Sequence, residues 1–228
     1  HEAWGNLARK VAHEIKNPLT PIQLTIDRLK NKYSSQLKSN EKENFSENLK
    51  IINNQIKQIE KLVNEFSDFA RMPKPIFQNN NLVEIVNDNI KLLSELDMSI
   101  IINFKNNSDK IIFNSDKEQL SRVFFNLIKN SIESIHQKSE KMANFEKKIT
   151  IELNENDNHI SIIIDDTGIG FKNLNTNIKD ILNPYFTTKT NGTGLGLSIV
   201  NKIINDHNGN IEFLSKEEGA KIKVMFLK

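Results

Sequence analysis

The 228-residue sequence contains no cysteine, which excludes disulfides, thiolate metal sites and cysteine nucleophiles. Glycine is scarce, at 8 residues, and only 37% of the chain is hydrophobic, which favours a helix-rich or elongated protein over one compact globule. No stretch approaches the roughly 18–20 apolar residues of a membrane span. The net charge of +2 gives no support for binding an extended polyanion, so we expect no nucleic-acid partner. These absences predict a soluble, intracellular protein.

Two long apolar stripes with helical spacing precede residue 73. The first runs from Trp4 to Tyr33 in steps of three and four, and the second alternates steps of four and three from Phe45 to Phe66. This heptad pattern predicts two helices in coiled-coil-like packing, joined by a polar turn at residues 34–43. Because two helices cannot fully cover each other's stripes, we expect two hairpins to associate as a homodimeric four-helix bundle.

After the proline-rich segment 72–75, helical and strand patterns mix. We expect helices over 82–96, from Asp116 as N-cap to about 136, and from 195 to about 207, where Asn208-Gly209 provides a left-handed cap. Strands are expected over 98–104, 148–154, 159–165, 210–215 and 220–227, with asparagine-rich residues 79–81 as a loop. This mixture predicts an α+β sandwich.

His13 lies away from the apolar stripe of the first helix. At about 100° per residue it shares a face with Lys16, Asn17 and Thr20, so a rigid helix presents its imidazole to solvent. Pro18 and Pro21 destabilise the same helix, because proline cannot donate a backbone hydrogen bond. Such an unfavourable sequence beside an exposed histidine indicates a functional site. An ordinary surface histidine beside a tolerated kink is the alternative.

A row of polar residues lies along one face of the helix that is expected after Asp116. Asn126 and Asn130 stand one turn apart in this row, and their amide oxygens suit a hard cation such as Mg²⁺. The alternative is a solvated helix face.

Two glycine-containing motifs complete the set of candidates. Asp165-Asp166-Thr167-Gly168-Ile169-Gly170 follows a strand, where glycines allow close approach of a flat ligand and a carboxylate accepts from an exocyclic amine. A plain turn is the alternative there. Residues 192–197, GTGLGL, open a helix whose free N–H groups form an anion cradle. The polar stretch 171–191 between them has the composition of a lid.

In this order, the motifs resemble those of sensor histidine kinases of two-component signalling, over essentially the whole chain. The sequence segments HEIKNPLTPIQLT and FARMP are most similar to those of the NtrY nitrogen-regulation subfamily. The resemblance implies a dimerisation and histidine-phosphotransfer domain at residues 1–72, a linker at 73–76 and a catalytic ATP-binding domain at 77–228. The second domain would have the α/β sandwich fold shared with the gyrase and heat-shock chaperone ATPases.

The resemblance also implies a role for each candidate residue. His13 would be the phosphoacceptor, Glu14 would orient or take its ring proton, and Asn17 would orient water when phosphate is removed from the regulator. Asn126 and Asn130 would hold Mg²⁺ against ATP. The remaining ATP-binding residues would be Asp166, Gly168, Gly170, Lys189, Thr193, Gly194, Leu195 and Gly196.

The implied function is ATP-dependent autophosphorylation of His13 and transfer of the phosphoryl group to an aspartate of a response regulator. The implied location is the cytoplasmic portion of a bacterial inner-membrane sensor, with membrane contact only through upstream segments. One rival is a dimeric pseudo-kinase scaffold that binds nucleotide without turnover. A second is an ATPase of the chaperone or mismatch-repair type, which would carry a glutamate where this chain has Asn126.

Overall fold

The computed structural model describes residues 2–70, 72–171, 181–182, 194–214 and 216–228. They form two compact units, a helical hairpin and a unit that comprises Lys74–Phe186 and Gly196–Lys228. In the part of the chain that is described, no helix has the length and apolarity needed to cross a membrane.

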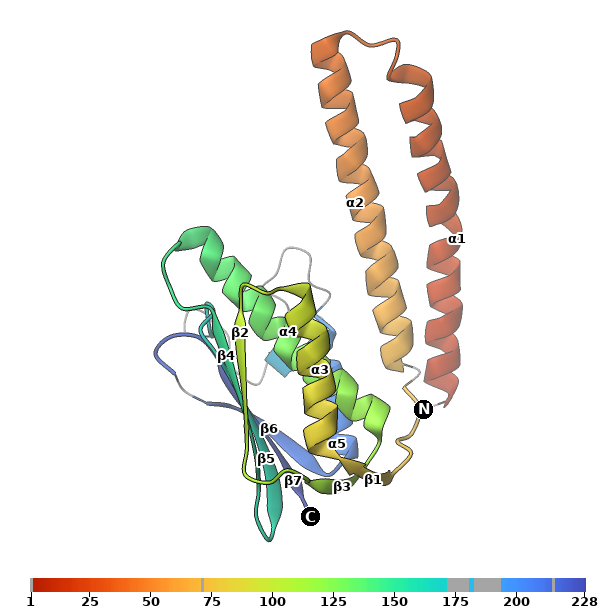
Figure 1. Cartoon of the computed structure of the whole chain (residues 1–228). Helices are drawn as coiled ribbons and strands as arrows, with labels where there is room; N and C mark the ends of the chain where they lie inside the picture. The colour runs from red at the N-terminus through yellow and green to blue at the C-terminus, as the bar shows by residue number, and fades with distance from the viewer. Residues whose placement is uncertain (1, 71, 172–180, 183–193, 215) are drawn as a thin grey trace. The chain divides into compact units, whose positions relative to one another are not determined.

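The hairpin consists of helices α1 (Glu2–Tyr33) and α2 (Ser39–Ala70), which lie side by side (Figure 1). Its core is a cluster of four buried side chains, Leu19 and Ile26 from α1 and Leu49 and Ile56 from α2, with Phe45 packed against it. The buried residues of α2 recur every seventh position, as the heptad pattern predicts. Helix α1 continues through both internal prolines.

A second apolar row on each helix stays exposed within one hairpin. In α1 it contains Ile15, Ile22 and Leu29, and in α2 it contains Ile52 and Ile59, each between 38% and 45% exposed. The stripes seen in the sequence therefore divide into one half that closes the hairpin and one half that the hairpin does not cover.

The second unit contains three helices and two sheets. Its elements are α3 (Leu82–Leu96), α4 (Lys117–Lys141), α5 (Gly196–Asp206), β1 (Gln78–Asn81), β2 (Ile101–Asn106), β3 (Ile112–Ser115), β4 (Lys148–Glu155), β5 (His159–Asp166), β6 (Gly209–Leu214) and β7 (Lys221–Leu227). The main sheet has the order β2-β4-β5-β7-β6, in which β2 and β4 are parallel and the other pairs antiparallel.

The three helices cover one face of this sheet (Figure 1). Alternate residues of β5 are buried, as expected for a strand with one face against helices. The expected α+β sandwich is thus confirmed, and it brings the carboxyl end of β5 beside α4.

Three expectations about local structure were wrong. The turn between the hairpin helices ends before 43, because α2 already begins at Ser39. Residues 79–81 belong to β1 rather than to a loop, because the Asn80 side-chain amide donates to the carbonyl of Ser115 on β3 and Asn81 Oδ1 accepts from Val83 N–H at the start of α3. Helix α4 continues beyond 136 to Lys141, where the Met142 N–H donates to the Lys138 carbonyl.

Candidate functional site

Asp166, at the end of β5, is a buried carboxylate with three hydrogen-bond donors. Its Oδ1 accepts from Gly168 N–H at 2.9 Å and from Ala220 N–H at 3.2 Å, and the Ser131 hydroxyl also bonds the carboxyl group. Only 3% of the residue is exposed. Burial raises the pKa of Asp166, while these donors and the charge of Lys216 act in the opposite direction. Because both backbone donors bind Oδ1, the group is held in one orientation.

The two glycines after Asp166 are required by the protein itself. A Cβ on Gly168 would lie 2.2 Å from the Ser134 hydroxyl oxygen of α4, and Gly170 has φ +68° and would place a Cβ 2.2 Å from the Gly219 carbonyl. The sequence suggested that these glycines admit a flat ligand. In the structure they allow the loop after β5 to pack against α4 and the β6–β7 turn.

Several residues of this site carried no recognisable signal in the sequence. Ser131 and Ser134 of α4 bond the Asp166 carboxyl and the Ile169 N–H respectively. The β6–β7 turn supplies Ala220, whose carbonyl accepts from the Asp166 N–H at 2.9 Å. These contacts join segments far apart in the chain, so only the fold shows them.

The polar row on α4 is not an ordinary solvent face. Gln119 is buried, and Arg122, Asn126, Asn130 and Glu133 are half-buried. Asn130 directly precedes Ser131, so the helix brings it next to a partner of the Asp166 carboxyl. The amide oxygens of Asn126 and Asn130 form a donor set that fits Mg²⁺.

Helix α5, which packs beside α4, begins at Gly196, after a left-handed Gly194 with φ +70° and a buried Leu195. A Cβ on Gly196 would meet no atom within 4 Å, so the start of this helix borders open space. Lys189, Thr193 and most of the stretch expected to act as a lid lie outside the described residues.

In the hairpin, His13 is exposed on α1 together with Glu14 and Asn17, while its neighbour Ala12 is buried. The imidazole is therefore presented outward from a continuous helix, as the heptad pattern predicts. His13 belongs to one compact unit and Asp166 to the other.

Comparison with known families identifies both units. Residues 3–75 match the His Kinase A (phospho-acceptor) domain, and residues 115–228 match the family described as histidine kinase-, DNA gyrase B-, and HSP90-like ATPase. The chain belongs to the histidine kinase family. The likeness to the NtrY group is confirmed as well. The chain is 39% identical to a putative sensor histidine kinase NtrY-like of Rickettsia felis and 35% identical to nitrogen regulation protein NtrY of Azorhizobium caulinodans.

These alignments cover 98% and 95% of the chain but only 36% and 28% of the two relatives, so this histidine kinase chain spans about a third of their length. Among solved structures, the complex of histidine kinase ThkA with response regulator protein TrrA matches with a TM-score of 0.66 and 26% identity, over 100% of this chain and 62% of that one. The isolated catalytic domain of ThkA matches 67% of the chain with a TM-score of 0.57 and 28% identity, over 96% of that domain.

Proposed function

We propose that this chain uses ATP to phosphorylate His13 and then passes the phosphoryl group to an aspartate of a response regulator. The observation that carries the proposal is an exposed imidazole on a helix of the phospho-acceptor type, in the same chain as a rigid buried carboxylate in an ATPase fold. The ThkA–TrrA complex supports the choice of a response regulator as partner.

In this proposal Asp166 receives the exocyclic amine of adenine. Since both backbone donors occupy Oδ1, the other carboxylate oxygen is the natural acceptor for that amine. Gly168 and Gly170 hold the floor of the site, and the N–H groups around Gly194, Leu195 and Gly196 receive phosphate oxygens at the start of α5. Lys189 and Thr193 are proposed to contact the phosphates from the segment before Gly194.

Asn130, with Asn126 one turn before it, would hold Mg²⁺. When bound, the metal would neutralise charge on the phosphates, which is a main requirement of phosphoryl transfer. Both asparagines are half-buried on α4, one helical turn apart.

At His13, a ring nitrogen lone pair forms the N–P bond as the bond between the γ-phosphorus and the β,γ-bridging oxygen breaks and ADP leaves. A neutral imidazole carries a lone pair on one ring nitrogen, so the attack needs no metal or separate base at that atom. Glu14, the next residue on α1, takes or orients the proton on the other ring nitrogen. Correct alignment of donor and acceptor is then the controlled step.

Asn17 is proposed to act in dephosphorylation of the response regulator. It is exposed one helical turn after His13, on the same face of α1, where its amide would orient a water for removal of phosphate from the regulator. The names of the relatives support nitrogen regulation as the pathway.

The exposed apolar rows support a homodimer. Burying Ile15, Ile22, Ile52 and Ile59 against a second hairpin would complete a four-helix bundle, which removes the hydration cost of these side chains. We propose domain boundaries at 1–72 for the dimerisation and phosphoacceptor domain, 73–76 for the linker and 77–228 for the catalytic domain. The whole protein is proposed to be a bacterial inner-membrane sensor, of which this chain is a cytoplasmic portion.

The alternative of a pseudo-kinase scaffold is not favoured, because His13, Asn130, Asp166 and the glycine-rich start of α5 are all present. The test is incubation of the full chain with Mg-ATP labelled on the γ-phosphate. Label that is acid-labile and alkali-stable supports a histidine kinase. Nucleotide binding without any label would support the scaffold instead.

A further inference from the structure

Two lysines from different elements bind consecutive backbone carbonyls at the end of β5. Lys216, in the β6–β7 turn, donates from Nζ to the carbonyl oxygen of Asp166 at 2.7 Å. Lys138, on α4, donates from Nζ to the carbonyl oxygen of Thr167 at 3.1 Å. The two ammonium groups therefore fix the peptide units on either side of Thr167, where the chain leaves the sheet for the loop with Gly168.

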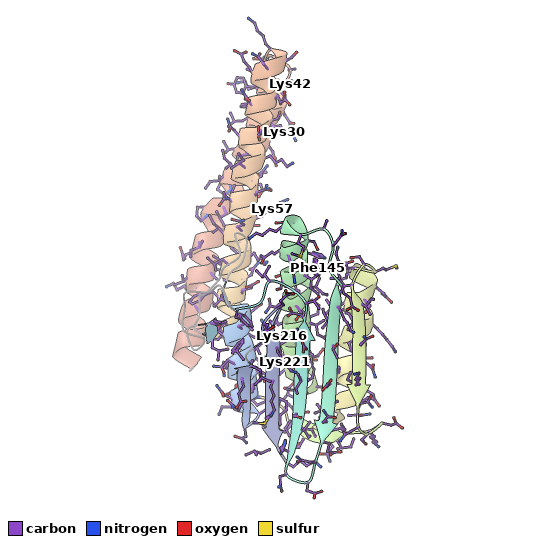
Figure 2. The ribbon with its side chains drawn as sticks, turned by 90° about the vertical axis from the view of Figure 1, so that its left-hand side faces the viewer. Lys30, Lys42, Lys57, Phe145, Lys216 and Lys221 are labelled. Carbon is purple, nitrogen blue, oxygen red and sulfur yellow. The ribbon has the colours of Figure 1, made fainter. Side chains whose placement is uncertain are left out.

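Both lysines are themselves held in place. Lys216 forms an ion pair with Asp165 Oδ1, and Lys221 reaches Asp165 Oδ2 at 3.6 Å. Figure 2 shows Lys216 and Lys221 near one another. Lys138 lies over the ring of Phe145 at 4.7 Å and pairs with Glu218 at 3.4 Å, and its side chain is only 15% exposed. Partial burial makes charge-assisted bonds of this kind stronger than fully exposed surface pairs.

The position of these bonds matters because the carbonyl and the carboxyl of Asp166 share one Cα. A rotation of the peptide after Asp166 would move the Gly168 N–H away from the carboxyl, which would then lose one of the donors that fix its orientation. Gly219 has no room for a Cβ, which would lie 1.9 Å from the Asp166 carbonyl, so Lys216 reaches this oxygen beside a tightly packed turn.

We propose that Lys216 and Lys138 are positioning residues for nucleotide-base recognition: by binding the carbonyls of Asp166 and Thr167, they aim the Asp166 carboxylate at the exocyclic amine of adenine. This inference rests on the proposed ATP site. Nothing in it requires contact between either lysine and the nucleotide.

The competing interpretation is that the lysines only stabilise the fold. The two interpretations predict different affinities for a nucleotide that lacks the exocyclic amine. Loss of general stability weakens binding of every nucleotide alike, whereas misalignment of the carboxylate weakens only the nucleotide that carries the amine. The ratio of two affinities therefore isolates the positioning role.

The experiment measures, on the full chain, the Kd of a non-hydrolysable ATP analogue and of the matching purine-riboside analogue that lacks the amine. We expect the unmodified chain to prefer the adenine nucleotide by about tenfold or more, the value of one charge-assisted hydrogen bond. Lys216→Met keeps the aliphatic stem but removes the charge, and should reduce this preference to about threefold or less. Lys138→Met should reduce it in the same direction.

Two further variants control the test. Lys221→Met removes the other cation beside Asp165, which does not touch the Asp166 carbonyl, and should leave the preference unchanged. Lys216→Arg restores a cation and should recover most of it. An equal loss of affinity for both nucleotides in Lys216→Met and Lys138→Met, or an unchanged preference, would overturn the inference while leaving the ATP site intact. Failure of the unmodified chain to bind ATP would instead contradict the proposed function.

Discussion

The backbone N–H of Asp116 donates to Nε2 of His207 across 3.0 Å and so joins the start of α4 to the end of α5. The other ring nitrogen, Nδ1, lies 2.8 Å from the carbonyl oxygen of Ile203 and must donate to it, so this pattern requires the neutral ring with its proton on Nδ1. His207 is only 2% exposed. A histidine at the C-terminal end of a helix can complement the helix dipole with its charge, but here the ring forms a buried neutral link.

The last linker residue and the residue after it also contact Asp116 and His207. The Ile76 N–H donates to Asp116 Oδ2 at 2.9 Å, and the Phe77 ring packs edge-on against His207 with centroids 5.2 Å apart. Asp116 Oδ1 meanwhile caps α4 through the Gln119 N–H. The buried ring of His207 thus holds α4, which carries Asn126 and Asn130, against α5.

We expect His207→Ala to destabilise the second unit by about 3 kcal/mol, because it creates a cavity and leaves the Asp116 N–H without its acceptor. Urea unfolding of the full chain measures the change. His159→Ala at the half-exposed start of β5 is the matched control and should cost less than about 1 kcal/mol. Equal losses in the two variants would show that the buried link contributes nothing specific.

Asp166→Asn should separate stability from nucleotide binding. Burial raises the pKa of Asp166, so its ionised form destabilises the fold at pH values above the folded pKa, and this cost disappears as the pH falls through that value. Asparagine keeps an oxygen for the two backbone donors but carries no charge. We therefore expect no loss of unfolding free energy at pH 7, a flatter pH dependence on the acid side, and at least about tenfold weaker ATP binding.

Denaturant unfolding across a pH series and titration with a non-hydrolysable ATP analogue measure the two effects. Asp157→Asn, in the exposed β4–β5 turn, is the control for removal of a carboxylate and should change neither quantity appreciably. If Asp166→Asn lost stability in proportion to binding, Asp166 would be a structural residue rather than the base-recognising group.

The uncovered apolar rows predict a variant that is folded but monomeric. Lysine at Ile22 and Ile59 together places two charges in the expected dimer interface and should convert a dimer to a monomer in light scattering at micromolar concentration. Leu24→Lys is the control, because Leu24 is 53% exposed and lies about 200° around α1 from Ile22. A monomeric unmodified chain would refute the dimer.

Asn17→Ala should spare autophosphorylation of His13 and slow dephosphorylation of the regulator, because the amide is needed only to orient water. Both rates are measured with the same protein preparation and a phosphorylated receiver domain. Equal loss of the two activities would reject a separate role for Asn17.

Local patterns predicted the elements well where one face of an element is buried. The structure contains three predicted features: buried residues of α2 at seven-residue spacing, the N-cap at Asp116, and the left-handed Asn208 with φ 56°. The error at 79–81 has a physical cause, since asparagine favours loops by propensity, but here Asn80 and Asn81 use their side-chain amides to bond neighbouring segments.

The site was only partly predictable for a related reason. Asp166 follows a buried strand and its motif is visible, whereas Ser131, Lys138 and Lys216 act through contacts between segments distant in sequence. A lysine in a polar turn has no periodicity that distinguishes it from a solvated one. The stripes of α1 and α2 indicated an amphipathic hairpin but did not indicate which half of each stripe would face the other helix.

The most direct test of this account is localisation of the phosphoryl group after incubation of the full chain with Mg-ATP. Mass spectrometry under alkaline conditions should find an acid-labile phosphate on His13 alone, and His13→Gln should abolish labelling while it leaves the Kd for ATP unchanged. Phosphate on another residue, or labelling that persists in His13→Gln, would contradict the assignment of His13 as the phosphoacceptor.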